Sequence, residues 1–125
     1  MKITSIALDL DGTTLNSQGV LSERTRRALV RAAQSGICVI PASGRSFDSL
    51  PGEILRIPEV RYVITSNGTA VVDVHAGTYL RKFVLTEESV EKILLLMEDE
   101  QVAYEAFIDG KAYAQSAYVE DPVRF

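Results

Sequence analysis

Two carboxylates stand two residues apart, directly after a short apolar run. Residues 3–8 are mostly apolar, and Asp9, Asp11 and Gly12 come directly after them. Side chains alternate between the faces of a strand, so both carboxylates are expected on one side where the strand ends. Their mutual repulsion calls for a divalent cation with oxygen ligands. There Asp9 can attack a phosphoryl group. Asp11 can exchange a proton with the leaving oxygen and with water, and the Gly12 amide can approach the phosphate.

Two further motifs follow later apolar runs. In the triplet Ser43-Gly44-Arg45, the Ser43 hydroxyl can bind a phosphoryl oxygen and Gly44 gives access to the backbone. A short helical segment, interrupted by Pro51 and closed near Pro58, is expected after this triplet. Its N-terminus would favour an anion, and Ser43 could also cap it. A surface salt bridge would explain Arg45 as well as phosphate binding does. Asn67 could contact a substrate or only shape a turn, because Asn-Gly is itself a turn dipeptide.

The elements that must position these residues alternate between strand and helix. Short apolar runs at 3–8, 37–42 and 62–65 predict strands, and the apolar stripe of 22–35 predicts a helix that ends before Gly36. This alternation predicts parallel strands in an α/β fold. The continuous apolar character of the first strand predicts burial on both of its faces. Polar residues end all three strands, where open α/β sheets bind ligands.

The second half of the chain has a different pattern. Hairpins are predicted over 70–84 and 102–115, with a helix that starts after Thr86 between them. Phe107 and Tyr113, on the second hairpin, are interpreted as packing residues. An antiparallel α+β unit is therefore expected to begin near residue 70, which divides the chain into units 1–69 and 70–125.

Composition bounds the class of protein. The chain has 125 residues, 46% of them hydrophobic, and a net charge of −4 without a basic stripe, so nucleic acid is not an expected partner. No apolar stretch reaches the roughly 18 residues of a membrane span, and no signal peptide precedes the first strand. The single cysteine, Cys38, is predicted to be a buried small apolar residue, which fits a reducing cytoplasm. The oligomeric state is left open.

Taken together, the three motifs resemble those of the haloacid-dehalogenase superfamily, within it the Cof-like branch. The resemblance implies a Rossmann-like parallel-sheet core, here incomplete, followed by the start of an α+β cap. It implies Asp9 as nucleophile and Mg²⁺ ligand, and Asp11 as general acid and base that binds the metal through its main-chain carbonyl. In that pattern Ser43, Gly44 and Arg45 bind the phosphoryl group together with Gly12, and Asn67 precedes the cap. The implied substrate is a small phosphorylated metabolite, such as a sugar phosphate.

Part of the family pattern is not found in these 125 residues. The family requires a lysine after the cap and an acidic motif similar to Gly-Asp-x-x-Asn-Asp. The chain is therefore expected to be a truncated and catalytically incomplete phosphatase. One alternative is a fragment that binds or assembles without turnover. A phospho-accepting receiver domain is a less favoured alternative, because residues 65–68 read Thr-Ser-Asn-Gly where a receiver carries its aspartate.

Overall fold

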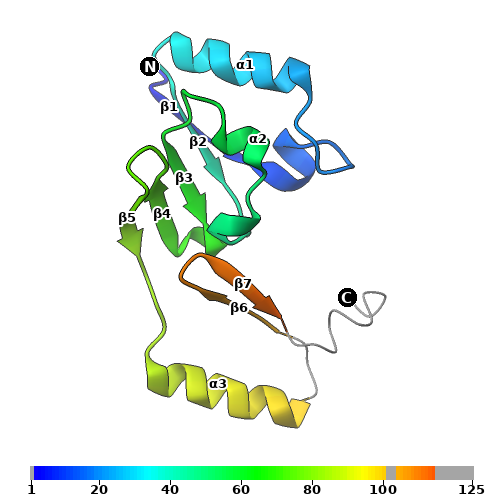
Figure 1. The fold of residues 1–125 in the computed structure, drawn as a ribbon, viewed down its shortest axis with the longest axis vertical. Coiled ribbons are helices and arrows are strands. Elements are labelled where there is room, and N and C mark those ends of the chain that lie inside the picture. The colour runs from blue at the N-terminus through cyan, green and yellow to red at the C-terminus, as the bar shows by residue number, and fades with distance from the viewer. Residues whose placement is uncertain (1, 101–103, 115–125) are drawn as a thin grey trace.

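A five-stranded sheet and a separate two-stranded hairpin form the framework of the chain (Figure 1). The structure is a computed structural model that describes residues 2–100 and 104–114. Short helical turns lie at 10–14, 47–49 and 66–68. The longer elements are β1 (Ser5–Asp9), α1 (Glu23–Gln34), β2 (Cys38–Ala42), α2 (Gly52–Leu55), β3 (Tyr62–Thr65), β4 (Ala70–Asp73), β5 (Thr78–Lys82), α3 (Glu87–Glu100), β6 (Glu105–Ile108) and β7 (Lys111–Ala114).

The predicted parallel arrangement of the first three strands is confirmed. The strand order is β1-β2-β3-β4-β5, and β1, β2 and β3 pair in parallel. β4 and β5 then continue the same sheet in antiparallel pairing. The predicted boundary between residues 69 and 70 thus falls between two paired strands of one sheet. We propose that the second unit begins in the linker after Lys82.

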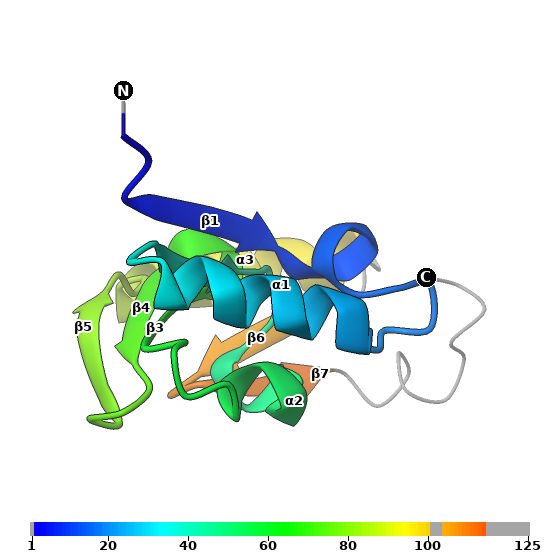
Figure 2. The same ribbon diagram turned by 90° about the horizontal axis from the view of Figure 1, so that it is seen from above.

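The hydrophobic core lies on one face of the sheet. α1 and α2 pack on the same side (Figure 2), where Leu29 and Ile54 join the buried side chains of β2, β3 and β4. α1 starts at Ser22, whose hydroxyl accepts a hydrogen bond from the Thr25 amide, and Gly36 follows its end with φ +84°. The start and stop signals predicted from the sequence therefore give the two ends of this helix correctly.

The opposite face of the sheet contributes nothing to this core among the described residues. Along β2, Val39 and Pro41 are buried while Cys38 is exposed and Ile40 is half-buried. In β1 only Leu8 is partly buried. The predicted burial of the first strand on both faces and of Cys38 is therefore wrong. β1 pairs on one side only, and the helices cover one face of the sheet, a difference that an apolar run cannot reveal.

The second half follows the predicted order of hairpin, helix and hairpin. The Thr86 hydroxyl accepts a hydrogen bond from the Ser89 amide, which caps α3. Asp109 and Gly110 both adopt positive φ (48° and 83°) in the turn between β6 and β7. The outer ends of this predicted hairpin, at 102–103 and 115, lie outside the described residues. None of the helices in the described part of the chain combines the length and apolar character that crossing a bilayer requires.

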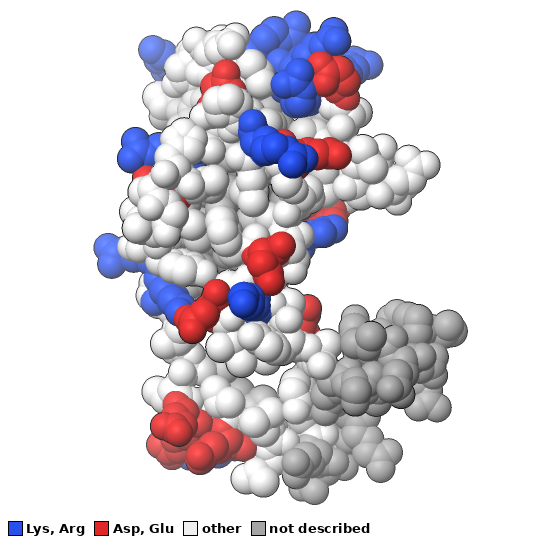
Figure 3. Space-filling model, in the orientation of Figure 1, with Lys and Arg blue, Asp and Glu red and all other residues white. Residues whose placement is uncertain are grey.

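Charged side chains of both signs are spread over the face seen in Figure 3. Basic side chains gather over α1, which carries four arginines, and acidic side chains gather where α3 begins, with Glu87 and Glu88 in its first turn. Between these two ends charges of both signs are mixed, so on the described part of this face no single-sign field marks out a ligand site. The site has to be found from local geometry.

Candidate active site

The ends of three neighbouring strands bring the sequence motifs together. Asp9 pairs with Ala42, and Ala42 pairs with Ile64 across the parallel strands. The Ser43 amide continues this alignment by donating to the Ile64 carbonyl (3.0 Å). The hairpin β6–β7 lies just beyond these carboxyl ends (Figure 1). The predicted site residues therefore meet at one edge of the sheet, facing the hairpin.

The turn after β1 holds the two carboxylates on the exposed side. Leu10, between them, is fully buried, while Asp9 and Asp11 are exposed. Gly12 adopts φ +73°, a left-handed conformation that glycine reaches without steric cost. The Leu15 amide then closes the turn on the Leu10 carbonyl (2.8 Å). The alternation predicted from the Asp-x-Asp spacing is thus present, with the intervening side chain as an anchor in the core.

Two threonines bind Asp9, one at its carboxylate and the other at its main-chain carbonyl. Thr13 Oγ1 donates to Asp9 Oδ2 (3.2 Å), and Thr14 Oγ1 donates to the Asp9 carbonyl (2.6 Å). Sequence reasoning gave Thr13 no place in the site. Its position four residues after Asp9, across a glycine turn, was the available signal. The hydrogen bond limits the rotation of the Asp9 carboxylate.

Asp11 is bound by Arg45. Nε and Nη2 of Arg45 donate to the two carboxylate oxygens of Asp11 (2.9 and 2.7 Å), and Nη1 donates to the Ser49 carbonyl (3.1 Å). These hydrogen bonds lower the pKa of Asp11 below its ordinary value. Arg45 does form a salt bridge, and its partner is the second carboxylate of the site. Asp11 is consequently held in its ionised form in this state.

Ser43 lies buried in the loop after β2. Its Oγ accepts a hydrogen bond from the Arg45 amide (3.2 Å). The short helical segment expected after the triplet is present as a three-residue turn, Phe47–Ser49, followed by α2. The helix N-terminus expected to favour an anion at Ser43 does not form there, because the turn comes first and the side chain of Ser46 makes no capping bond to it. Three residues cannot build the dipole of a helix, so an anion at Ser43 would rely on local donors.

Gly44 and Asn67 join the second loop to the third. The Ser66 amide donates to the Arg45 carbonyl (2.8 Å), and both Ser66 and Asn67 adopt left-handed φ (52° and 54°). A Cβ added to Gly44 would lie 2.8 Å from Asn67 Oδ1. Of the two roles that the sequence left open for Asn67, the structure shows a turn residue whose side-chain amide packs on Gly44.

A cavity of about 310 Å³ opens beside Asp11 and Arg45. Glu105 and Phe107, from β6, line it opposite the loop after β2. Phe107 was interpreted as a packing residue, and Glu105 was not singled out. Both lie on the same face of a strand, because they are two residues apart. This spacing was the only sequence signal, and it does not tell which face of the hairpin meets the core.

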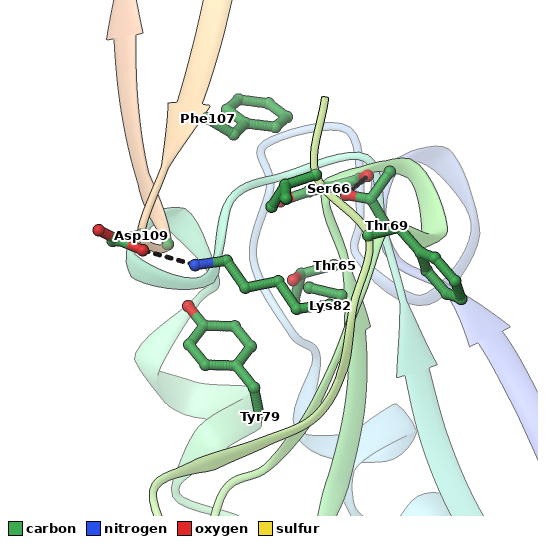
Figure 4. A pocket seen from close by; sticks show the side chains of 11 residues that line it. Thr65, Ser66, Thr69, Tyr79, Lys82, Phe107 and Asp109 are labelled. Carbon is green, nitrogen blue, oxygen red and sulfur yellow. Dashed lines mark hydrogen bonds and ion pairs between the residues drawn. The ribbon is translucent and has the colours of Figure 1, made fainter. Parts of the chain in front are cut away.

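A smaller cavity lies where the hairpin turn meets β5 (Figure 4). It has a volume of about 50 Å³, room for a few water molecules. Lys82 Nζ points at Asp109 Oδ1 and pairs with it, with the Tyr79 ring nearby. Thr65 Oγ1 is buried here without a hydrogen-bond partner among the described residues. The cavity is too small for a metabolite, and its ion pair holds the hairpin turn against the sheet.

The donors present suit a magnesium ion in type, and they are few. Among residues 2–100 and 104–114, no three His, Cys, Asp or Glu side chains lie together as a metal site. Asp9 offers a carboxylate, while that of Asp11 is occupied by Arg45. Mg²⁺ usually keeps several waters and takes only one or two protein carboxylates together with substrate phosphate oxygens. The donor set therefore fits Mg²⁺ as a partial coordination shell.

A family model described as haloacid dehalogenase-like hydrolase matches residues 6–124. The chain belongs to this family of hydrolases. The predicted membership, including the Cof-like branch, is confirmed, and so is the Rossmann-like core with its parallel strands.

Phosphatases are among the curated relatives. The chain is 31% identical over 108 residues to phosphatase YwpJ of Bacillus subtilis, covering 86% of this chain and 38% of that protein. It is 33% identical over 114 residues to pyridoxal phosphate phosphatase YbhA of Escherichia coli, covering 91% of this chain and 40% of that protein. The chain thus spans about two fifths of the length of these relatives.

Solved structures of the family share the fold. A haloacid dehalogenase-like hydrolase from B. subtilis superposes with a TM-score of 0.83 at 28% identity, covering 96% of this chain and 42% of that one. A haloacid dehalogenase superfamily phosphatase, BT1666 from Bacteroides thetaiotaomicron, gives a TM-score of 0.80 at 26% identity, covering 98% and 46%. Both the sheet and the following hairpin unit therefore have counterparts in this family.

Proposed function

We propose that this chain carries the nucleophile part of the active site of a Mg²⁺-dependent phosphatase for small phosphomonoesters. The observation that carries the proposal is the strand register, which sets Asp9 beside Ala42 and thereby next to Ser43. This pairing supports Asp9 as the nucleophile and the loop at Ser43 as the phosphate-binding loop. The family match and the phosphatase relatives support the same reaction class.

The proposed reaction has two steps. In the first, an Asp9 carboxylate oxygen attacks phosphorus, the ester P–O bond breaks, and the leaving alkoxide takes a proton from Asp11. In the second, water attacks the phosphorus of the aspartyl-phosphate, Asp11 accepts a proton from that water, and the Asp9 carboxylate is released with phosphate. Thr13 holds the attacking carboxylate in one orientation throughout. The Ser43 hydroxyl and the Gly12 amide bind the phosphoryl oxygens.

Arg45 has to change partners during this sequence. While it binds both oxygens of Asp11 it keeps that carboxylate ionised, which suits the base of the second step and opposes the acid of the first. A guanidinium binds phosphate oxygens with the same two-pronged geometry as a carboxylate. Transfer of Arg45 from Asp11 to the bound phosphate would therefore bind the substrate and let the pKa of Asp11 rise in one movement.

A bound Mg²⁺ would supply positive charge against the phosphoryl oxygens. The Asp9 carboxylate and the main-chain carbonyl of Asp11 would hold it. We also propose that catalysis needs residues beyond these 125, because the chain covers only about two fifths of its relatives. In the family pattern a lysine and an acidic motif complete the site.

The test is Mg²⁺-dependent phosphate release from p-nitrophenyl phosphate by a full-length parent protein. Asp9→Asn should abolish release, because the amide cannot form the aspartyl-phosphate. The control is Glu91→Gln, which also removes one negative charge but lies at an exposed position of α3. It should leave phosphate release unchanged. Full activity in Asp9→Asn would show that the nucleophile is misassigned. The 125-residue chain should show little or no turnover, and robust activity from it would overturn the proposed need for further residues.

A further inference from the structure

The face of the β6–β7 hairpin that lines the larger cavity carries only two large side chains. Glu105 pairs with Ala114 and Phe107 with Ala112 across the two strands, so these four residues share one face. Tyr113 and Ile108 fall on the other face by the same alternation. The two alanines leave space on the cavity side. Whatever occupies the cavity therefore meets Glu105 and Phe107 on the hairpin side.

The hairpin is fixed in place over the loop after β2. The Gly110 carbonyl accepts a hydrogen bond from the Asp48 amide (3.0 Å), and Asp109 pairs with Lys82. One contact reaches the loop that follows the Ser-Gly-Arg triplet, and the other reaches β5. Glu105 and Phe107 are thus set opposite Arg45 by two contacts of the hairpin turn with the core.

The cavity lies on the side of the site where the leaving group would be. Asp11, the proposed proton donor to the leaving oxygen, lines it, and Asp9 is not among its lining residues. A volume of about 310 Å³ is at the lower end of the range for small-molecule sites, which suits a group about the size of a single ring.

The charges that line the cavity do not balance. The carboxylate of Asp11 is compensated by Arg45. Glu105 takes part in no ion pair among residues 2–100 and 104–114, so its negative charge is the excess one. A carboxylate accepts hydrogen bonds from hydroxyl and ammonium groups and repels other anions. The Phe107 ring adds an apolar surface for a ring or for C–H groups.

Resting on the proposed function, we infer that Glu105 and Phe107 select the leaving group of the substrate. They admit neutral polyhydroxy or cationic alcohols of single-ring size. They disfavour leaving groups that carry a carboxylate or a second phosphate. Substrate choice in this protein is then set by one acidic and one aromatic side chain of β6.

The test measures equilibrium binding to the 125-residue chain in the presence of Mg²⁺, monitored by the amide NMR chemical shifts of the protein. The probes are glucosamine 6-phosphate, glucose 6-phosphate and 6-phosphogluconate, which differ by one charge at each step. Affinity should fall in that order, by roughly fivefold per unit of charge even at the dielectric constant of water. Binding of each ester should change the chemical shifts of the β6 amides. Inorganic phosphate, which has no leaving group, should shift the loops at Gly12 and Ser43 without shifting β6.

Variants separate the two side chains. Glu105→Gln should bring the three affinities to within roughly threefold of one another, whereas Glu91→Gln should keep the order. Phe107→Ala should weaken all three esters by a similar factor. If phosphate binds but the three esters bind equally in the unaltered chain, or if Glu105→Gln leaves their order unchanged, the inference is overturned and the phosphate site stands. If neither phosphate nor any ester binds, both the inference and the proposed phosphate site fail.

Discussion

Gly44→Ala is expected to stabilise the protein more when Asn67 is also changed than when Asn67 is present. Gly44 does not use the left-handed region, so its backbone conformation is open to alanine. The obstacle is one atom, because the new Cβ would lie 2.8 Å from Asn67 Oδ1. Asn67, at φ 54°, is a residue that glycine can replace without backbone strain. The pair therefore allows a clash to be made and then removed.

The expected free energies follow from this geometry. A contact of 2.8 Å has to be relieved, and the atom that must move is the end of the exposed Asn67 side chain. Moving such a side chain off its preferred rotamer costs about 0.5–1.5 kcal/mol. Replacing glycine by alanine at a compatible position stabilises by about 0.4–1 kcal/mol through the unfolded chain. Gly44→Ala alone should thus be close to neutral, within about 1 kcal/mol of the unaltered protein. In the Asn67→Gly background the same change should stabilise by about 0.4–1 kcal/mol.

The assay is urea unfolding followed by circular dichroism for the four proteins of the double-mutant cycle. The coupling energy between the two positions should be about 0.5–1.5 kcal/mol, within the range of residues in contact. Equal effects of Gly44→Ala in both backgrounds, to within about 0.5 kcal/mol, would refute the contact. A stabilising effect of Gly44→Ala alone would show that the Asn67 amide rotates away freely.

Two further predictions concern carboxylates whose pKa values are lowered. Arg45→Ala should raise the pKa of Asp11 toward its ordinary value of 3.8, because Arg45 is the main cause of the lowered pKa. An NMR titration of the Asp11 carboxyl carbon measures this pKa. An unchanged pKa in the variant would contradict the pairing. Asp73, with its side chain buried, accepts hydrogen bonds from Arg61 and from the amides at 75 and 76, and its pKa is lowered chiefly by Arg61. Because its folded pKa is depressed, its stabilisation is present above 3.8 and is lost as pH falls through the lower folded value. Asp73→Asn should accordingly lower Tm at pH 7, and its difference from the unaltered protein should shrink on acidification below 3.8, as followed by thermal unfolding; a difference that does not depend on pH would contradict this.

Local signals accounted for the elements and for the place of the site. The serine cap and the glycine after α1, the cap of α3 and the Asp-Gly turn each depend on neighbours within a few residues. Their effect can be read along the chain. The alternation of strand and helix predicted parallel pairing. Parallel pairing in turn was the reason to expect the three motifs at one edge of the sheet.

Contacts between distant segments could not be predicted in this way. Arg45 and Asp11 are 34 residues apart, and no spacing rule says that one binds the other. Cys38 lies in an apolar run, yet its burial depends on what covers its face of the sheet. Glu105 enters the site because the hairpin turn is docked on the core by Gly110, a fact of tertiary packing.

Leu10 has a consequence for the dynamics of the site. It is fully buried, and its carbonyl closes the turn that carries Asp9 and Asp11. Neither carboxylate can swing away through backbone motion unless this side chain leaves the core. Such a motion belongs to the same cooperative unit as the sheet and approaches the free energy of global unfolding. The two acids are therefore tied to the packing of the core, and the adaptable part of the site is the side chain of Arg45.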